Sequence, residues 1–469
     1  MGNVSMNRLT KVFIYTFLVL FAFVPVILHF CDFLVVCYLF AVALFVLFLV
    51  KFDKMNFAVK LFLSALAIRL VVAATIQTPP QSDFALLLDA SQRLNNGDMS
   101  FLDTVYFQKW DYQMGFVFFQ SILLKIWNDT DFLRVVNCFF SAGNTLLIYL
   151  IAREFASRKS AKIASVLYCF LPFSVFYVTI LSNQFSASFF SYLGLYLIIS
   201  KGKMNEFLKY FIASVLLVIS NVLRPESIIP LLSILIYLVL SIRKGTCKNC
   251  LLRVSILVST YFLLKLIIGK LFAITGIAPF GLSNNDPLWK FVLGFDHGSG
   301  GVYSDAGNFY ATNEEALSLI QDRAFTYLHK LLYLFSNKIN VFWSGSATYW
   351  IFGPLLESGT YILRVNFPIN GLAEFVKDYS FNISLAMYVL LLIGMVAFIK
   401  KEPCNTKVLI IMSQVFITFG VYLLIEVQAR YIFHIQLSVF ILAALGIDFL
   451  SDLFKNSKKK LLTYLDRKE

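Results

Sequence analysis

A single carboxylate near the start of a polar stretch is the first candidate for chemistry in this sequence. Asp83 stands in the run Gln81-Ser82-Asp83-Phe84, shortly after an apolar segment that ends near residue 76. A carboxylate held close to a membrane surface and partly desolvated can act as a general base, which accepts a proton from a hydroxyl. The same residue could instead be a solvated loop carboxylate or a helix N-cap. We interpret Asp89, six residues further on, as structural.

A short Arg-Pro-Glu turn joins two apolar segments further along the chain. Arg224 lies in Leu223-Arg224-Pro225-Glu226, with almost no loop between the segments. Because proline is favoured in the first turn of a helix, this order predicts that Arg224 lies at the outer surface. Its guanidinium could hold a phosphate through two parallel hydrogen bonds. It could equally pair with Glu226 and contact lipid headgroups.

A second arginine occupies a similar place between the last two apolar segments. Arg430 precedes Tyr431, and tyrosine is typical of a lipid interface. Lys109 offers a further cation within an aromatic run, residues 106–112. A carboxylate and several cations at one membrane face predict a site for a lipid-phosphate substrate. The predicted donor-binding residues are Arg224, Arg430, Lys109, Tyr431 and Glu226.

The composition indicates what kind of protein carries these residues. The chain has 469 residues, of which 59% are hydrophobic and 14% are charged, and its mean hydropathy is +0.76. A soluble domain is about 45–50% apolar and about 25% charged, so this chain could not cover a water-exposed surface with polar side chains. Disordered, collagenous and disulfide-scaffold proteins are excluded by the same numbers. The sequence therefore predicts an all-α polytopic membrane protein.

The net charge is +13, from 40 Lys and Arg against 27 Asp and Glu. A basic excess can indicate nucleic-acid binding, but the cytoplasmic loops of membrane proteins also collect basic residues. We favour the membrane interpretation and expect no nucleic-acid partner. None of the seven cysteines lies in the long polar regions, so no external disulfide framework is expected.

A helix that crosses a bilayer needs about 20 mostly apolar residues. We predict about twelve such spans, near residues 11–30, 32–51, 57–76, 131–152, 161–181, 184–200, 207–223, 227–242, 253–273, 383–399, 408–426 and 431–450. Every second loop is basic, which predicts that these loops and both termini are cytoplasmic.

Two larger segments, about 77–130 and 274–380, are then extracytoplasmic. The first contains an apolar run, 115–127, that is short for a span and is expected to lie along the membrane surface. In the second, Thr312-x-x-Glu315 matches a capping box and predicts a helix from there to the mid-330s.

Other motifs in the sequence support no competing chemistry. The glycine-rich run 298–301 lacks the Lys-Ser/Thr of a phosphate-binding loop. The cysteine pair at 247 and 250 stands alone and the four histidines show no ligand spacing, so no metal site is predicted. His434, one turn past Arg430, is expected to pack. Charges within the spans are few, Arg69 being the clearest, which argues against a transporter.

Four short stretches resemble the GT-C superfamily of integral-membrane glycosyltransferases, in its protein-O-mannosyltransferase and aminoarabinose-transferase-like branch, especially bacterial members. They are the first outer segment from Ser82-Asp83-Phe84 to Tyr112-Gln113-Met114-Gly115-Phe116, the span ending Tyr149-Leu150-Ile151-Ala152-Arg153, Leu223-Arg224-Pro225-Glu226, and Gln428-Ala429-Arg430-Tyr431. The resemblance covers roughly residues 57–270 and 380–450. It implies a GT-C-like bundle of about twelve transmembrane helices with two larger extracytoplasmic segments.

This resemblance divides the chain into four regions. They are two additional N-terminal transmembrane helices (1–56), a GT-C-like core with the first outer catalytic loop (57–273), an extracytoplasmic loop with an amphipathic helix (274–380), and C-terminal transmembrane helices with a basic cytoplasmic tail (381–469).

The resemblance also implies a function. The donor would be a sugar on a polyprenyl phosphate, Asp83 the catalytic residue, and Arg224 and Arg430 ligands of the lipid phosphate. Many family members carry two adjacent acids in this loop, whereas Ser82 precedes Asp83 here. No cofactor is firmly implied, and a divalent metal stays open without any residue pattern in its support.

The expected reaction is an inverting transfer to an extracytoplasmic acceptor hydroxyl, on a cell-wall polymer, glycan, lipid or protein, at the cell membrane. Two alternatives are a lipid-linked glycan ligase or polymerase, and a transporter of lipid or polysaccharide.

Overall fold

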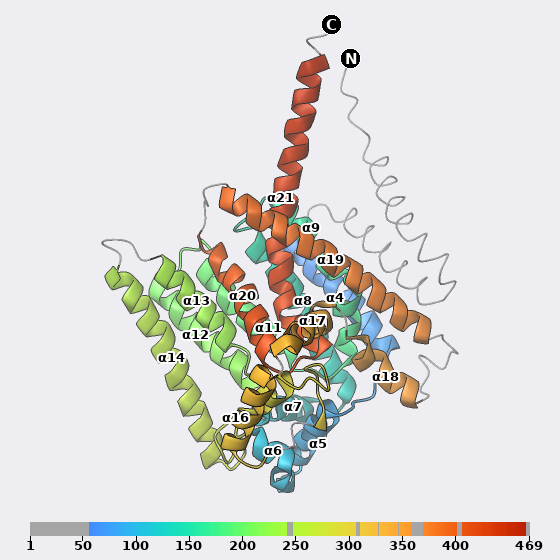
Figure 1. Ribbon diagram of the computed structural model, residues 1–469, viewed down its shortest axis with the longest axis vertical. Coiled ribbons are helices and arrows are strands. Elements are labelled where there is room, and N and C mark those ends of the chain that lie inside the picture. The colour runs from blue at the N-terminus through green and yellow to red at the C-terminus, as the bar shows by residue number, and fades with distance from the viewer. Residues whose placement is uncertain are drawn as a thin grey trace.

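The computed structural model describes residues 56–241, 247–305, 310–326, 328–345, 347–358, 369–400 and 406–465, and the only regular elements among them are helices (Figure 1). The helices are α4 (Phe57–Thr75), α5 (Asp83–Asn95), α6 (Val105–Lys109), α7 (Met114–Ile126), α8 (Thr130–Ala152), α9 (Arg158–Cys169), α10 (Pro172–Phe176), α11 (Gln184–Ile199), α12 (Glu206–Leu223), α13 (Ile228–Leu240), α14 (Cys247–Ile274), α15 (Trp289–Gly294), α16 (Asn313–Gln321), α17 (Leu328–Trp343), α18 (Thr348–Ser358), α19 (Ile369–Lys400), α20 (Val408–Leu424) and α21 (Ile432–Leu465). The predicted spans at 11–30 and 32–51, and with them the predicted N-terminal region at 1–56, lie outside the described residues save for residue 56.

Six of the described helices are long and apolar enough to cross a membrane, namely α4, α8, α12, α14, α19 and α21. Three further apolar helices are shorter, α11 with 16 residues, α13 with 13 and α20 with 17. The prediction of an all-α, multi-pass membrane protein is therefore confirmed, while the number of twelve spans stays a prediction.

One predicted span, near 161–181, is broken in the structure. α9 ends at Cys169, α10 begins at Pro172, and the two helices are bent by 57°. A proline has no N–H for the helical ladder and disfavours helical backbone in the residue before it. Leu171 accordingly has extended backbone, with φ −65° and ψ 113°. The segment is therefore two helices with a break between them, and its crossing of the membrane as one span stays a prediction.

Arg69, in α4, is fully buried in the bundle and is satisfied by neutral groups. Its Nε donates to Ser141 Oγ on α8 and its Nη2 to Ser174 Oγ on α10, both at 2.7 Å. A third bond runs from Nη1 to the carbonyl oxygen of Ala65 at 3.1 Å. The guanidinium thus ties three helices together, which is a structural role.

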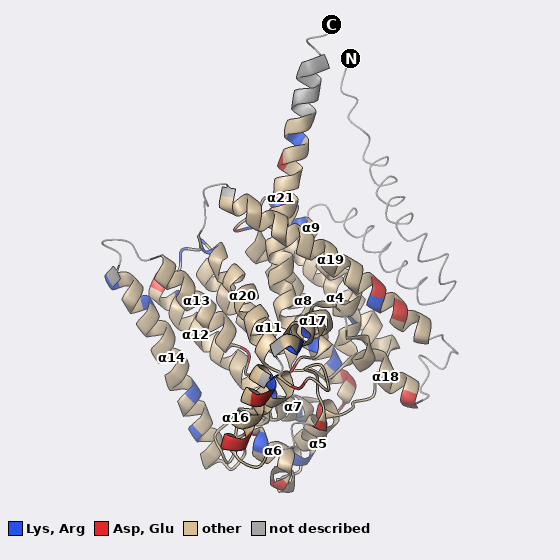
Figure 2. Ribbon diagram, in the orientation of Figure 1, with Lys and Arg blue, Asp and Glu red and all other residues tan. Residues whose placement is uncertain are grey.

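The connections between the helices divide between the two ends of the bundle (Figure 1). At the end from which α21 projects, the N–H of Ser157 donates to Asp448 Oδ2 on α21 at 3.3 Å, and Lys407 Nζ donates to the carbonyl oxygen of Ile198 at 2.6 Å. α5, α6, α7 and α16 lie at the opposite end, where Figure 2 shows acidic and basic residues close together. The two large polar segments therefore share one end, and which end is cytoplasmic stays a prediction.

The apolar run at 115–127 forms α7, which packs against α5, α8 and α12. Val117 and Leu124 are buried, whereas Ile126 at the end of the helix is 71% exposed. Gly115 allows a close approach, because a Cβ atom there would lie 2.0 Å from the carbonyl oxygen of Val222 at the end of α12. The position of α7 relative to a membrane surface stays a prediction.

The second large segment differs in some respects from its prediction. Thr312 caps α16 as predicted, since its Oγ1 accepts from the N–H of Glu315 at 3.2 Å. The Glu315 side chain reaches back one residue beyond the N-cap, where its Oε2 accepts from the N–H of Ala311 at 2.7 Å. The predicted helix to the mid-330s is not one regular α-helix: α16 ends at Gln321, a π-helical turn follows over Asp322–Thr326, and α17 begins at Leu328. α16 packs on α15, whereas α17 packs on α20.

Candidate active site

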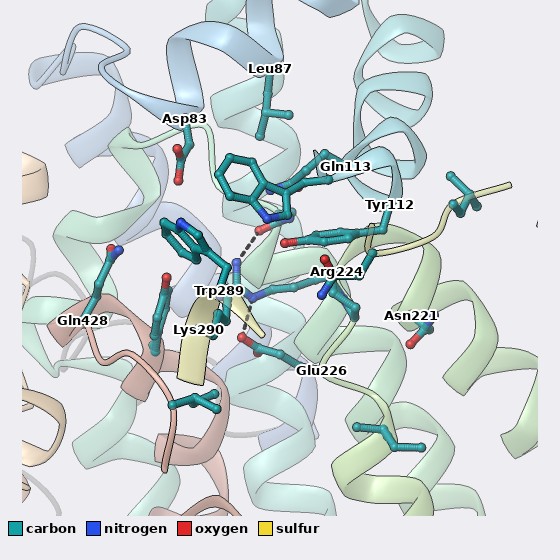
Figure 3. Close-up of a pocket in the computed structure, with 18 of the residues that line it drawn as sticks. Asp83, Leu87, Tyr112, Gln113, Asn221, Arg224, Glu226, Trp289, Lys290 and Gln428 are labelled. Atoms are coloured by element: carbon teal, nitrogen blue, oxygen red, sulfur yellow. Dashed lines mark hydrogen bonds and ion pairs between the residues drawn. The ribbon is translucent and has the colours of Figure 1, made fainter. Parts of the chain in front are cut away.

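A cavity of about 1990 Å³ opens at the end of the bundle that carries the two large segments. Its polar region is lined by the start of α5, the turn between α12 and α13, residues 281–284 with 289 and 290, and the turn between α20 and α21 (Figure 3). Its apolar region runs between α13, α14 and α20, where the lining residues include Leu232, Phe262 and Val421. Lys265 and Lys270 of α14 also line the cavity.

Asp83 is the first residue of α5, and its carboxylate points into the cavity (Figure 3). Its Oδ2 accepts a hydrogen bond from Nη2 of Arg430 at 2.9 Å. The Asp83 side chain is 37% exposed, whereas the Arg430 side chain is 6% exposed. The residue is therefore neither a free loop carboxylate nor the N-cap, which is Ser82. It is a carboxylate anchored through one oxygen and open to the cavity.

The backbone just before Asp83 is strained. Ser82 has a φ of 50°, in the region that favours glycine. Such a conformation costs about 1–3 kcal/mol and persists only where the surroundings enforce it. Here it turns the chain from the Gln81 loop into α5 and fixes where the Asp83 side chain begins.

Arg430 is held by aromatic and polar neighbours. The centre of its guanidinium lies 4.1 Å from the ring centroid of Trp350 and 4.9 Å from that of Phe84. Its Nε donates to Gln428 Oε1 at 2.6 Å, and its carbonyl oxygen accepts from Gln184 Nε2 at 2.8 Å. These contacts fix the guanidinium, and through it the orientation of the Asp83 carboxylate.

Arg224 caps the C-terminal end of α12, where Pro225 prevents the helix from continuing. Its Nε donates to Glu226 Oε1 at 2.6 Å and its Nη1 donates to Asn183 Oδ1 at 3.1 Å. Although burial opposes ionisation of Glu226, the neighbouring Arg224 prevails and holds the pKa of this carboxyl below its usual value. The ion pair expected as one alternative is thus present, and it lines the cavity.

Tyr431 lies at the centre of the polar region. Its hydroxyl donates to Glu426 Oε2 at 3.1 Å, and Glu426 Oε1 accepts from Gln428 Nε2 at 2.6 Å. Three cations surround its ring: the distances to the ring centroid are 5.3 Å from the Arg224 guanidinium, 5.6 Å from that of Arg430, and 5.1 Å from Lys290 Nζ. Residues from three separate stretches of the sequence therefore meet at one aromatic ring.

Lys290 is the site residue that the sequence did not indicate. It lies in α15, which begins at Trp289, and lines the cavity beside Arg224 and Glu226 (Figure 3). Burial lowers the pKa of its ammonium group, an effect that the nearby Glu426 carboxylate partly offsets. The only sequence signal was a Trp-Lys pair after a turn-rich stretch, which is too common to single out.

Lys109 is not among the residues that line the cavity. Its Nζ forms an ion pair with Asp286 Oδ2 at 3.0 Å, and its carbonyl oxygen accepts from the N–H of Asn285 at 2.9 Å. Lys109 thereby links the first large segment to the second. Asp89 is 62% exposed and pairs with Arg93 on the same helix at 3.6 Å, in keeping with a structural interpretation.

Within the described residues, no three His, Cys, Asp or Glu side chains are grouped so that they could hold a metal ion. His434 packs in the bundle, with Nδ1 3.2 Å from Ser188 Oγ and its ring against Tyr192.

Neither a known protein family nor a curated protein matches the sequence. Among solved structures, the chain is similar to the archaeal oligosaccharyltransferase AglB from Archaeoglobus fulgidus in complex with an inhibitory peptide and a dolichol-phosphate, with 15% identity, a TM-score of 0.46, and coverage of 85% of this chain and 52% of the other. It is also similar to the apo form of the Archaeoglobus fulgidus oligosaccharyltransferase, with 13% identity, a TM-score of 0.48, and coverage of 88% and 53%. The chain thus spans about half the length of these structures. The similarity is confined to the arrangement of helices.

Proposed function

We propose that this protein is a membrane glycosyltransferase that moves a sugar from a polyprenyl-phosphate-linked donor to an extracytoplasmic acceptor hydroxyl. The observation that carries the proposal is the cavity itself. It combines an accessible carboxylate, a cluster of cations and an apolar region between helices, all in one continuous space. A lipid-linked sugar phosphate presents the matching groups in the same order: a sugar, an anion and a hydrocarbon chain.

In the proposed reaction Asp83 is the general base. The acceptor hydroxyl oxygen attacks the anomeric carbon while its proton passes to the Asp83 carboxylate. The bond from the anomeric carbon to the phosphate oxygen breaks, and its electron pair leaves with the polyprenyl phosphate. A single displacement of this kind inverts the anomeric centre. The Arg430 bond to Oδ2 orients the carboxylate.

The leaving phosphate needs stabilisation by positive charge as its own charge grows. Arg224 and Arg430 supply guanidinium groups around the Tyr431 ring. Glu226 holds Arg224 through their ion pair. Lys109 acts at a distance in this proposal, by holding the two large segments together through Asp286.

The apolar region of the cavity would take the prenyl chain. Ile228 and Leu232 of α13, Leu266 of α14 and Ile417 of α20 line it. Burial of hydrocarbon is worth about 0.8 kcal/mol for each methylene group, so even the first isoprene units would contribute to binding.

The experiment that tests this function is sugar transfer by the purified, reconstituted protein. Polyprenyl-phosphate sugars would be offered with an envelope acceptor extract, and donor consumption and product would both be measured. Transfer by the wild-type protein supports the proposal. Transfer of a whole glycan from a lipid-linked oligosaccharide would favour a ligase or polymerase, and lipid movement without any transfer would favour a transporter.

A further inference from the structure

Two of the three cations around Tyr431 already have a carboxylate partner. Arg224 pairs with Glu226 at 2.6 Å and Arg430 pairs with Asp83 at 2.9 Å. The third cation, Lys290, has neither a hydrogen bond nor an ion pair from its Nζ within the residues that the structure describes. Its Nζ lies 5.1 Å from the centroid of the Tyr431 ring. Of the three cations around Tyr431, Lys290 is therefore the one without an ion pair to a carboxylate among the described residues.

The carboxylate that acts most strongly on this cation is already engaged. Glu426 is fully buried, and its two carboxylate oxygens accept hydrogen bonds from Gln428 and Tyr431. The backbone N–H of Glu426 donates to the carbonyl oxygen of Lys290 at 2.7 Å, which fixes α15 against the turn between α20 and α21. The Lys290 backbone is thus anchored while its ammonium group stays available to the cavity.

A fully buried lysine in the same large segment, Lys338, provides a comparison with Lys290. Lys338 Nζ donates to the carbonyl oxygens of Gly294 at 2.9 Å and Leu423 at 2.7 Å, and the residue is 1% exposed. It does not line the cavity. A half-buried ammonium group without such bonds destabilises the fold, because it has lost hydration, unless an anion pairs with it. Lys290 lines the cavity, so an anion in the cavity can reach it.

We propose that Lys290 binds the phosphate group of the lipid-linked donor, together with the Arg224 and Arg430 guanidinium groups. This inference rests on the proposed function. It differs from the expectation drawn from the sequence, in which the two arginines were the main phosphate ligands. In the structure they hold the Asp83 and Glu226 carboxylates, so the unpaired lysine supplies the charge that the phosphate neutralises.

The test measures binding rather than transfer. The wild-type protein, Lys290→Met, Lys290→Arg and Lys338→Met are placed in neutral phosphatidylcholine nanodiscs. The affinity of each is measured for a short polyprenyl monophosphate and for the matching polyprenol, which lacks the phosphate. The ratio of the two affinities isolates the phosphate contribution from that of the hydrocarbon chain.

We expect the wild-type protein to prefer the phosphate, and Lys290→Met to lose about 10- to 100-fold of that preference, the range for a charge-assisted hydrogen bond. Lys290→Arg should keep most of it, because the charge remains. Lys290→Met should melt no lower than the wild type, since it removes an unpaired buried charge. Lys338→Met should melt lower but keep the preference.

Two results would overturn the assignment. If the wild type prefers the phosphate and Lys290→Met prefers it equally, Lys290 is not the ligand and the proposed function survives. If the wild type does not distinguish the phosphate from the alcohol, the lipid-phosphate donor itself is excluded. The two failures are therefore separable.

Discussion

Nη2 of Arg430 lies 2.9 Å from Oδ2 of Asp83, although 347 positions separate the two residues in the sequence. The bond joins the start of α5 to the turn before α21, and both residues line the cavity. It leaves the Asp83 side chain 37% exposed, so the carboxylate is both fixed and accessible. A general base needs both properties.

Replacing Asp83 by asparagine tests this directly. The amide oxygen can still accept from Arg430 but the side chain can no longer take a proton, so transfer should fall by about 10²- to 10⁴-fold. The thermal unfolding midpoint should change little. The matched control is Asp89→Asn on the same helix. This variant should retain full activity, because the Asp89 side chain is 62% exposed and its ion pair is with Arg93. Unchanged transfer in Asp83→Asn would remove this residue from the mechanism.

Strain at Ser82 predicts opposite effects for two substitutions. Ser82→Gly should raise the unfolding midpoint, because glycine adopts a φ of 50° without the cost of about 1–3 kcal/mol. Ser82→Val should lower it and reduce transfer, since a β-branched residue fits this backbone poorly and would displace Asp83. Thermal melts and transfer rates of the two variants check this. A Val variant as active and stable as the wild type would show that the strain has no role.

Close packing of α7 on α12 predicts that Gly115→Ala disturbs the site indirectly, by displacing the end of α12 next to Arg224. The added Cβ would meet the carbonyl oxygen of Val222 at 2.0 Å, two residues before Arg224, so α12 must shift. Both the unfolding midpoint and the affinity for the polyprenyl-phosphate sugar should fall. Gly420→Ala in α20 is the control, because nothing lies within 4 Å of a Cβ atom there, and alanine is favoured over glycine in a helix by about 0.5–1 kcal/mol. Equal behaviour of the two variants would refute the packing argument.

Donor binding should weaken as the solution becomes alkaline. Only the protonated form of Lys290 attracts a phosphate, and burial lowers the pKa of this group from its ordinary 10.5. Affinity for a polyprenyl-phosphate sugar should thus be greatest at neutral pH and fall as pH rises through the lowered pKa, before 10.5 is reached. The other charged or titratable groups that act on Lys290 or contact it are Glu426, Arg224, Glu226, Arg430 and Tyr431.

The Lys290→Arg variant distinguishes the titration of Lys290 from that of the neighbouring groups. Lys290→Arg keeps its charge throughout this range, so its affinity should stay flat where that of the wild type falls. Binding isotherms between about pH 7 and about pH 10 provide the measurement, since arginine stays protonated over that interval. If the affinity falls equally with rising pH in both proteins, the titrating group is not Lys290.

Local patterns in the sequence were sufficient for much of the fold. Apolar runs predicted helices at α4, α8 and α12 because a membrane helix must satisfy its own backbone and present apolar side chains. The capping box at Thr312 fixed the start of α16, since its bonds join residues three and four positions apart. The end of that helix could not be predicted, because it depends on which distant surfaces α16 and α17 cover.

The candidate site divides in the same way. The sequence by itself determined the membrane class, and it singled out Asp83, Arg224 and Arg430 as polar residues at the ends of apolar segments. Only the tertiary structure decided that Asp83 pairs with Arg430, that Lys109 turns away to Asp286, and that Lys290 joins the cluster. Periodicity, caps and prolines act over a few neighbouring residues and are therefore written locally. Ion pairs and cavities depend on the packing of helices hundreds of residues apart, which no local pattern records.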